Sequence, residues 1–268
     1  MYIYKTMSDS FYTFPSAQYL VVCGDIHGDF NQLVNKVCVQ YQLHDTVIVV
    51  AGDCGFGFER KGYYDNVVKR NNKRMNESNN WIVFVRGNHD NPAYFDGQAF
   101  RHERFMAVPD YSVIKVGGHS ALCVGGAISI DRNYRIAAWA NECNLRQTPP
   151  PNDGALSPNY HWPNEYPVFN LQLLEQVLAH NTIDVVITHS APSFCNPTSK
   201  LQLSSWIVDD ELYDDVRRER KVMDQLYEKL KGSTITHWCY GHFHQSWHSS
   251  IEGVLFKMLD IMELYEIR

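Results

Sequence analysis

Residues that can bind metal ions stand in five short clusters along the 268-residue chain. The clusters contain Asp25, His27, Asp53, Asn88, His189, His242 and His244. Nitrogen and oxygen donors without a thiolate suit manganese, iron, cobalt, nickel or zinc better than a dedicated calcium site. Two such cations ~3.5–4 Å apart can hold a phosphate and activate water, which suits the hydrolysis of phosphate esters. The donor set therefore predicts two adjacent metal ions, and we expect manganese first among these metals.

The spacing within the clusters suggests how the donors divide between the two ions. Alternate residues at a strand end point the same way, so Asp25 and His27 can bind one ion together. His242 and His244 repeat this spacing and can serve both ions. Asp53 lies between the two sets in the chain, and we expect it to bridge the metals.

Asn88 and His189, the two remaining donors, complete the second metal site. His89, the neighbour of Asn88, can carry a proton. Asn88 offers a neutral carbonyl oxygen, and His189 offers an imidazole. His89 directly follows Asn88, where it could protonate the leaving oxygen as a general acid.

Each cluster follows a short, apolar and largely β-branched segment that we expect to be a strand. These segments are 19–23, 46–51, 81–85, 183–188 and 234–240. Helix-length polar stretches at 30–42, 63–79, 171–180 and 209–231 alternate with them, which is typical of α/β folds. Ligands in such folds gather beyond the carboxyl ends of the strands. The five clusters should therefore meet at one edge of a sheet.

Smaller signals predict the remaining elements. Gly117-Gly118 separates two apolar runs, 113–116 and 120–124, as in a β-hairpin. Further strands are expected at 246–249 and 254–259, and residues 1–17 should form an extended arm or a short edge strand. Pro92 can occupy the first position of a helix.

The pattern breaks down over residues 131–168. Pro149-Pro150-Pro151 and Trp162-Pro163 stand among aromatic residues, so we expect an ordered insertion without regular structure, close to the site. Arg132 and Arg135 could bring positive charge to a phosphate or simply form surface ion pairs. His161 could touch the substrate. Because there are no repeats and no linker, residues 1–268 are expected to form a single domain that carries this insertion.

The composition of the chain limits its possible partners and its cellular location. The formal net charge of −6 gives no overall basic surface, so nucleic acid is a possible partner but not a favoured one. The basic cluster at 217–221 is expected to be a solvated helix face. Seven cysteines without CxxC spacing form no disulfide framework, and no apolar run approaches the ~18 residues of a membrane span. With no leader recognisable at the start, we expect a cytoplasmic protein without membrane contact or an evident protein partner.

The clusters match, in order and type, the calcineurin-like metallophosphoesterase superfamily, which the chain resembles over about residues 19–248. The resemblance rests on four motifs: Gly24-Asp25-Ile26-His27-Gly28, Gly52-Asp53, Gly87-Asn88-His89-Asp90 and Gly241-His242-Phe243-His244. It implies an α/β fold, a four-layer α/β/β/α sandwich. It further implies a first metal held by Asp25, His27, Asp53 and His244, a second held by Asp53, Asn88, His189 and His242, and His89 as the catalytic histidine.

The chain departs from this pattern at two places. Serine/threonine protein phosphatases and diadenosine tetraphosphatases carry an Asp-Arg pair after the second Gly-Asp, where this chain has Cys54-Gly55-Phe56-Gly57. A carboxylate that orients the catalytic histidine and an arginine that grips phosphate are therefore missing from this loop. Asp90 stands where these relatives have Glu, and we expect Asp90 to cap the next helix and Arg86 to be structural. Protein-phosphatase activity is not expected.

The sequence thus predicts a binuclear, metal-dependent phosphoric ester hydrolase. Its expected substrate is a small phosphomonoester, phosphodiester or nucleotide, attacked by a hydroxide that the two metals bind. One alternative is a nuclease that uses the same centre, which a local basic groove would favour. The other is an inactive binding module of the same fold, against which the complete ligand set argues.

Overall fold

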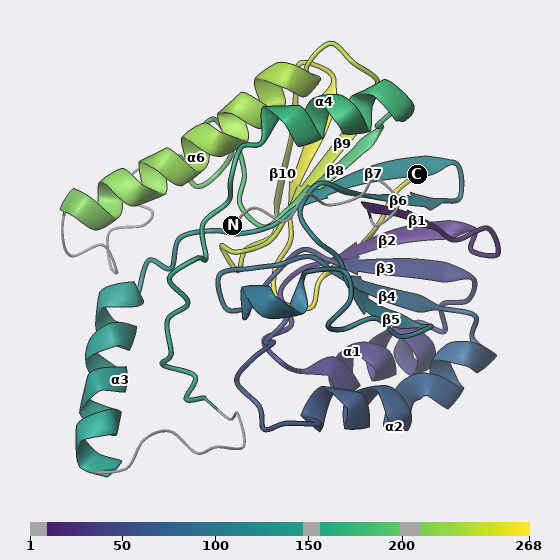
Figure 1. Cartoon of the computed structure of the whole chain (residues 1–268). Helices are drawn as coiled ribbons and strands as arrows, with labels where there is room; N and C mark the ends of the chain where they lie inside the picture. The colour runs from purple at the N-terminus through teal and green to yellow at the C-terminus, as the bar shows by residue number, and fades with distance from the viewer. Residues whose placement is uncertain (1–9, 147–155, 199–209) are drawn as a thin grey trace.

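Two β-sheets form the centre of the protein in the computed structural model, which describes residues 10–146, 156–198 and 210–268 (Figure 1). The five-stranded sheet has the order β12 (Leu264–Glu266), β2 (Tyr19–Cys23), β3 (Thr46–Val50), β4 (Trp81–Phe84) and β5 (Phe105–Ala107). The seven-stranded sheet has the order β1 (Phe11–Thr13), β6 (Ser112–Val116), β7 (His119–Val124), β8 (Val185–Thr188), β9 (His237–Tyr240), β11 (Val254–Met258) and β10 (Trp247–Ile251).

The strands that precede the metal-ligand clusters run parallel to one another within each sheet. In the five-stranded sheet, β2, β3 and β4 are parallel, and the register pairs Val21 with Ile48 and Ile48 with Ile82. In the other sheet, β8 lies between β7 and β9 and is parallel to both. Parallel pairing brings the carboxyl ends of neighbouring strands to the same edge, as the sequence predicted.

Apolar side chains fill the space between the two sheets and the space between each sheet and its helices. Between the two sheets, Val22 of β2 and Ile187 of β8 are buried in one cluster. The next residue back in β2, Val21, faces the opposite way and packs in the layer beneath the helices of the five-stranded sheet. Both faces of the central strands are therefore buried, which explains their continuous apolar sequences.

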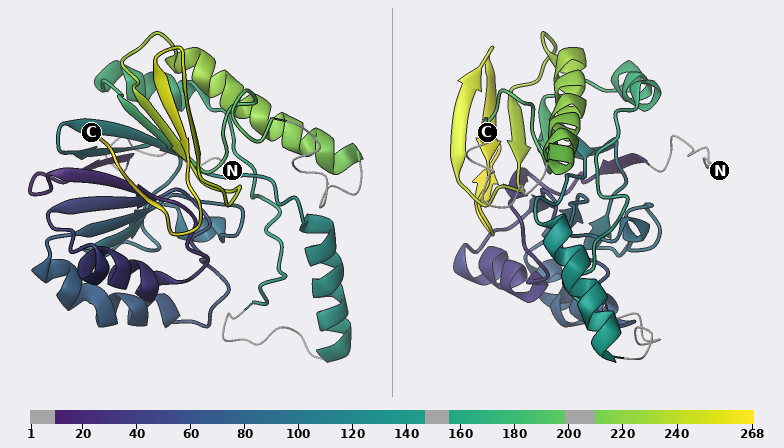
Figure 2. Two further views of the ribbon diagram at one scale, coloured as in Figure 1. Left: turned by 180° about the vertical axis from the view of Figure 1, so that it is seen from behind. Right: turned by 90° about the vertical axis from the view of Figure 1, so that its left-hand side faces the viewer.

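Helices cover the outer face of each sheet (Figures 1 and 2). The five-stranded sheet carries α1 (Phe30–Asn35), the π-helical turn η2 (Lys36–Gln40) and α2 (Tyr63–Glu77). The seven-stranded sheet carries α4 (Leu171–His180) and α6 (Asp210–Leu230). The order helix, sheet, sheet, helix confirms the predicted four-layer α/β/β/α sandwich.

The expectation of an insertion without regular structure at 131–168 was wrong for its first half, which is the helix α3 (Arg132–Arg146). This segment contains neither proline nor glycine, and it includes Ala137-Ala138, which favour a helix. The proline-rich stretch that suggested a loop begins only after α3 ends, and Pro149-Pro150-Pro151 lies outside the described residues. Figure 2 shows α3 projecting from the layered body.

Two smaller expectations also need correction. Pro92 begins only a short 3₁₀ turn, η3 (Pro92–Tyr94), and its N-cap is Asn91, whose side chain accepts from Ala93 N, rather than Asp90. The short strand β12, which pairs with β2 in antiparallel fashion, was not predicted. Within the described ranges, none of the helices is long and apolar enough to cross a membrane.

Candidate metal centre

The seven predicted metal ligands come together in two overlapping groups beyond the ends of β2, β3, β4, β8 and β9. The first ligand group consists of Asp25, His27, Asp53 and His244, which each offer a donor atom within 4.8 Å of the others. Asp53, His189 and His242 meet the same condition, and Asn88 Oδ1 joins them 2.9 Å from His189 Nε2. These four form the second ligand group. Asp53 belongs to both groups, as a bridging carboxylate must.

The first ligand group is half open to solvent. His27 Nε2 and His244 Nε2 lie 3.0 Å apart, and His244 Nε2 is 3.0 Å from Asp25 Oδ2. Asp25 uses its other oxygen, Oδ1, to accept a hydrogen bond from His242 N at 3.0 Å. Asp25 Oδ2 is buried without a hydrogen-bond partner of good geometry. An uncompensated carboxylate oxygen beside two imidazole nitrogens fits a cation at this position.

The second ligand group is more enclosed: Asp53, Asn88 and His189 are buried, and His242 is partly exposed. His189 Nδ1 lies 2.7 Å from Ala51 O, so Nδ1–H donates to this carbonyl and Nε2 turns toward the group. His189 Nε2 is 3.1 Å from Asp53 Oδ1, and the rings of His189 and His242 lie 5.0 Å apart. Two imidazoles, one carboxylate and one amide oxygen form a donor set that suits a borderline divalent cation.

Electrostatics favour positive charge at both groups. Burial opposes protonation of His189, but the carboxylates of Asp53 and Asp25 raise its pKa to about 10. Burial also opposes ionisation of Asp53, yet His189 and His89 hold the pKa of that carboxyl well below its usual range. The Asp25 carboxylate raises the pKa of His244. The carboxylates therefore favour protons on His189 and His244, and cations that bind there have to displace such protons.

The backbone is strained where it presents the ligands. His27, Asp53, His242 and His244 have φ values of 45°, 46°, 72° and 50°. This left-handed region costs a residue with a Cβ atom roughly 1–3 kcal/mol, and such residues gather at functional sites. Four of the seven candidate ligands share this conformation.

Two motif glycines allow the ligands to approach each other. A Cβ atom at Gly52 would lie 2.1 Å from His189 Nδ1, and Gly52 has a φ of +99°. A Cβ atom at Gly87 would lie 2.1 Å from Asp53 Oδ1. A side chain at either position would displace a candidate ligand.

Asp90 has a different role from the predicted helix cap. Its fully buried carboxylate accepts hydrogen bonds from the backbone N–H groups of Cys54, Gly55, Phe56 and Gly87, at 2.8–3.1 Å. Asp90 therefore fixes the loop after Asp53 against the loop that carries Asn88. Arg86 is structural, as expected, because it donates to Asn164 O and Glu165 O and pairs with Asp110.

The structure brings Arg135 of α3 to His89. Arg135 is only 2 % exposed, and its Nη1 lies 3.2 Å from His89 Nε2. A guanidinium can only donate, so Nε2 must be unprotonated in this contact and the imidazole carries its proton on Nδ1. Burial lowers the pKa of His89, and the Arg135 charge lowers it further against the opposing effect of Asp53.

The other two substrate-binding candidates, Arg132 and His161, lie next to acidic side chains that are not candidate ligands. Arg132 Nη2 pairs with Asp215 of α6 at 2.5 Å. His161 Nε2 lies 3.2 Å from Glu165 Oε1. Arg132 and His161 both line a cavity of about 660 Å³ beside α6.

Side chains that the sequence did not single out surround the second ligand group. Ser129 Oγ accepts a hydrogen bond from Asn88 Nδ2 at 3.0 Å and donates to Glu165 Oε2 at 2.5 Å. Glu219 of α6 accepts from Ser190 Oγ, next to His189. Ser129 follows the end of β7, so the expectation that site residues lie just beyond strand ends could have pointed to it. No sequence signal pointed to Glu165 or Glu219.

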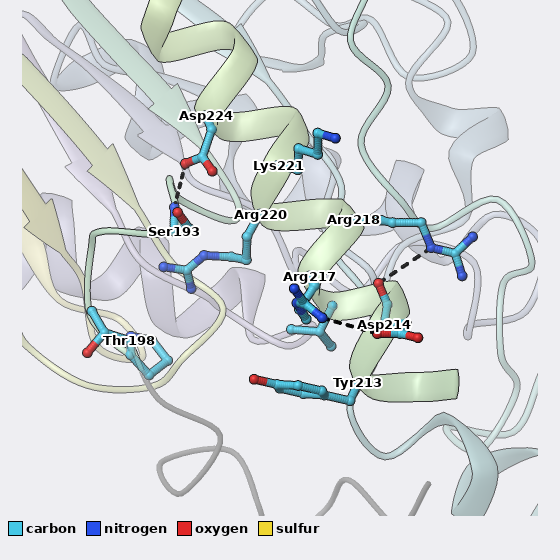
Figure 3. A pocket seen from close by; sticks show the side chains of 11 residues that line it. Ser193, Thr198, Tyr213, Asp214, Arg217, Arg218, Arg220, Lys221 and Asp224 are labelled. Atoms are coloured by element: carbon cyan, nitrogen blue, oxygen red, sulfur yellow. Dashed lines mark hydrogen bonds and ion pairs between the residues drawn. The ribbon is translucent and has the colours of Figure 1, made fainter. Parts of the chain in front are cut away.

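The basic cluster at 217–221 lines a second cavity, of about 690 Å³, between α6 and the segment after β8 (Figure 3). Arg217 Nη1 lies 3.5 Å from Asp214 Oδ1, and Arg218 pairs with Asp215. Arg220 is buried and donates two hydrogen bonds to backbone carbonyls. Asp214 and Asp215 partly offset the charge of Arg217 and Arg218, so in the part of the chain that the structure describes this face mixes acidic with basic side chains.

Comparison with known proteins places these motifs in a family. A family model described as calcineurin-like phosphoesterase matches residues 19–246. Among solved structures, the chain is similar to the phosphopantetheinyl hydrolase PptH from Mycobacterium tuberculosis, with 12% identity over 91% of each chain and a TM-score of 0.37. It is also similar to a cold-active protein-tyrosine phosphatase from a Shewanella species, with 12% identity over 92% of this chain and 72% of that chain and a TM-score of 0.35. Comparison with curated proteins gave no match.

Proposed function

This chain belongs to the calcineurin-like phosphoesterase family and is therefore a metal-dependent phosphoesterase, and we propose that it hydrolyses a small phosphate ester at a two-metal centre. The observation that carries the proposal is the pair of ligand groups that share Asp53. We assign the first metal to Asp25, His27, Asp53 and His244, and the second to Asp53, Asn88, His189 and His242. Manganese is the first choice of metal, and iron, zinc, cobalt or nickel would also suit these donors.

When bound, the two cations would polarise the phosphate oxygens and lower the pKa of the water that attacks phosphorus. The protein must hold the metal ligands in place and deliver a proton to the leaving oxygen. His189 donates from Nδ1 to Ala51 O, which keeps Nε2 directed at the centre. The Asp90 carboxylate holds the loops of Asp53 and Asn88 together, so the bridging carboxylate stays in register with the amide oxygen.

His89 and Arg135 form the remaining catalytic pair in this proposal. In the free site, His89 Nε2 accepts from Arg135 Nη1 and holds no proton there. Arg135 keeps its contacts to the insertion, and a phosphate oxygen beside it would compete with His89 for the Nη1–H. His89 Nε2, released from that hydrogen bond, would then take up a proton from solvent and pass it to the leaving oxygen. Arg135 thus supplies positive charge that the loop after Asp53 lacks.

The substrate class follows from charge and size. The net charge of −6 and the acids beside Arg217 and Arg218 favour a phosphomonoester, phosphodiester or nucleotide over a long nucleic acid. We further propose that the whole chain acts as one domain in the reducing cytoplasm. All seven cysteines are free, which supports that setting.

Metal-dependent turnover tests the proposal. The purified full-length protein is stripped with a chelator, reloaded with Mn²⁺, and assayed on p-nitrophenyl phosphate and on bis(p-nitrophenyl) phosphate. We expect turnover of at least one ester, lost with the chelator and restored by Mn²⁺, and the preferred ester identifies the class. Bound metal without turnover of either ester, or turnover that ignores the chelator, would overturn it.

A further inference from the structure

One buried acid from the insertion at 131–168 reaches the back of the second ligand group. Glu165 is 2 % exposed, and both of its carboxylate oxygens accept hydrogen bonds from Ser129. Ser129 N donates to Oε1 at 2.8 Å, and Ser129 Oγ donates to Oε2 at 2.5 Å. A carboxylate can only accept, so the single hydroxyl proton of Ser129 must point at Glu165.

This arrangement turns the lone pairs of Ser129 Oγ toward the site. They accept from Asn88 Nδ2 at 3.0 Å and from Arg135 Nη1 at 3.3 Å. Neither donor could be replaced by an acceptor, because Ser129 has no second proton to offer. Glu165 therefore dictates that donors, and only donors, face Ser129 from the site.

The consequence for Asn88 concerns which end of its amide faces the cation. With Nδ2 held by Ser129, the opposite atom, Oδ1, lies 2.9 Å from His189 Nε2 inside the second ligand group. An amide turned by half a rotation would present its NH₂ to the cation and its oxygen to the lone pairs of Ser129. Both contacts would be repulsive, and NH₂ cannot bind a metal.

The same network holds Arg135 in place. Nη1 bridges Ser129 Oγ and His89 Nε2, while Nη2 donates to Pro158 O at 3.1 Å and to Tyr160 O at 2.5 Å. Four contacts to one buried guanidinium, two of them backbone carbonyls of the insertion, fix its place beside His89.

We propose that Glu165 and Ser129 are positioning residues that fix the amide of Asn88 with its oxygen toward the second metal and keep Arg135 against His89. The inference rests on the proposed two-metal function and adds that the insertion completes the second metal site. Outer partners of metal ligands commonly contribute 10–100-fold to metal affinity. Losing the orientation of Asn88 should therefore weaken the second site by roughly this factor and leave the first site unchanged.

The test measures metal binding in the absence of substrate. The full-length protein and its variants are titrated with Mn²⁺ by calorimetry, with stoichiometry checked by elemental analysis. In Glu165→Gln, the NH₂ group of the new side chain donates to Ser129 Oγ. The hydroxyl proton of Ser129 no longer has an acceptor there and can point at Asn88 instead. We expect one of two Mn²⁺ sites to weaken by roughly 10–100-fold. Ser129→Ala should weaken the same site, and Glu77→Gln, at an exposed helix end far from the network, should weaken neither.

A double-mutant cycle separates amide orientation from general support. Asp at position 88 offers an oxygen at both ends and needs no orientation. Glu165→Gln should therefore weaken the second site strongly in the Asn88 protein but not in the Asn88→Asp protein, where the freed Ser129 proton can donate to the carboxylate. An equal loss in both backgrounds, or no loss in the Asn88 protein, would overturn the inference. If Glu165→Gln does not fold, the same cycle with Ser129→Ala gives the answer. Wild-type protein that binds two Mn²⁺ but hydrolyses no ester would instead overturn the proposed function alone.

Discussion

The two ligand groups share Asp53 but differ in how the protein supports them. In the first group, the side chains of His27 and His244 are 32% and 45% exposed, and each holds its place through a left-handed backbone. In the second group, His189 is fully buried, and both His189 and Asn88 hydrogen-bond to partners from other loops. The exposed histidines of the first group are positioned by their own backbone, whereas His189 and Asn88 of the second group are positioned by hydrogen bonds to other loops.

This difference indicates that the two metals should behave differently. Buried ligands whose second atoms are already hydrogen-bonded lose little freedom on binding a cation, so they bind it tightly. Exposed imidazoles remain mobile and open to water. We therefore expect a slowly exchanging metal in the second group and a readily exchanging metal in the first.

The largest effect is expected from removing Asp53, the carboxylate that both ligand groups share. Asp53→Ala takes a carboxylate from both metals at once, so both should be lost together with activity. Loss of several kcal/mol of transition-state stabilisation corresponds to a decrease in kcat/KM on the order of 10⁴-fold. Elemental analysis and ester turnover measure both effects. Glu77→Ala, at an exposed helix end, is the control, and an Asp53→Ala protein that retains two metals would refute the bridge.

His89 tests the chemistry apart from the metals. His89→Ala should keep both metals and slow turnover by roughly 10²–10⁴-fold, the usual contribution of a general acid. The loss should shrink for an ester with a good leaving group, because such an oxygen needs no proton. His102→Ala removes a partly exposed histidine that lies beside Asp65, outside both ligand groups, and should change neither quantity. Metal loss in the His89 variant would show that His89 is a ligand or a support instead.

Because the two ligand groups differ in burial, substituting one histidine should weaken one metal site and spare the other, a smaller effect than that of Asp53→Ala. His244→Ala should lower the affinity of one Mn²⁺ by roughly 10–100-fold and leave the tighter site filled, whereas His189→Ala should empty the tighter site. Calorimetric titration of both variants distinguishes the two sites. Equal weakening of both sites by either substitution would mean that the groups bind metal as one unit.

The smallest effect concerns the fold behind the second group. Burial raises the pKa of Glu219 to about 7, from an ordinary value of 4.5. The folded protein therefore binds this proton more tightly than the unfolded chain does, and its stabilising contribution is lost as the pH rises from about 4.5 to about 7. The slope reaches at most about 1.4 kcal/mol per pH unit.

Urea denaturation of the chelated protein across this range measures the effect. Glu219→Gln cannot ionise, so its free energy of unfolding should fall less steeply with pH than that of the wild type. Glu77→Gln, at an exposed carboxylate, should leave the wild-type slope unchanged. A Glu219→Gln protein with the wild-type slope would show that the buried carboxyl is not the titrating group.

Local sequence rules were sufficient to predict the layers and to predict that the candidate ligands lie close together. Short apolar runs predicted the central strands, and the residues just after them predicted the ligands, because parallel strands end at a common edge. The same rules failed for α3, whose helical sequence was masked by the prolines and aromatics that follow it. They also failed for Glu165 and Glu219, which act across 36 and 29 residues on Ser129 and Ser190. Nothing in their local sequence marks such contacts.

The loop after Asp53 shows where motif comparison and structure diverge. The sequence lacks an acid and an arginine in this loop, and the structure brings Arg135 to His89 from another part of the chain. Asp90, expected to cap a helix, instead binds four backbone N–H groups of the site loops. Both outcomes depend on tertiary contacts.

The central claim is that two metals share Asp53, and diffraction from crystals of the Mn²⁺-loaded protein tests it most directly. An anomalous difference map should show two peaks ~3.5–4 Å apart, one within the first ligand group and one within the second, with Asp53 between them. The second peak should remain after a brief soak in chelator. A single peak, or two peaks that do not share Asp53, would contradict the account.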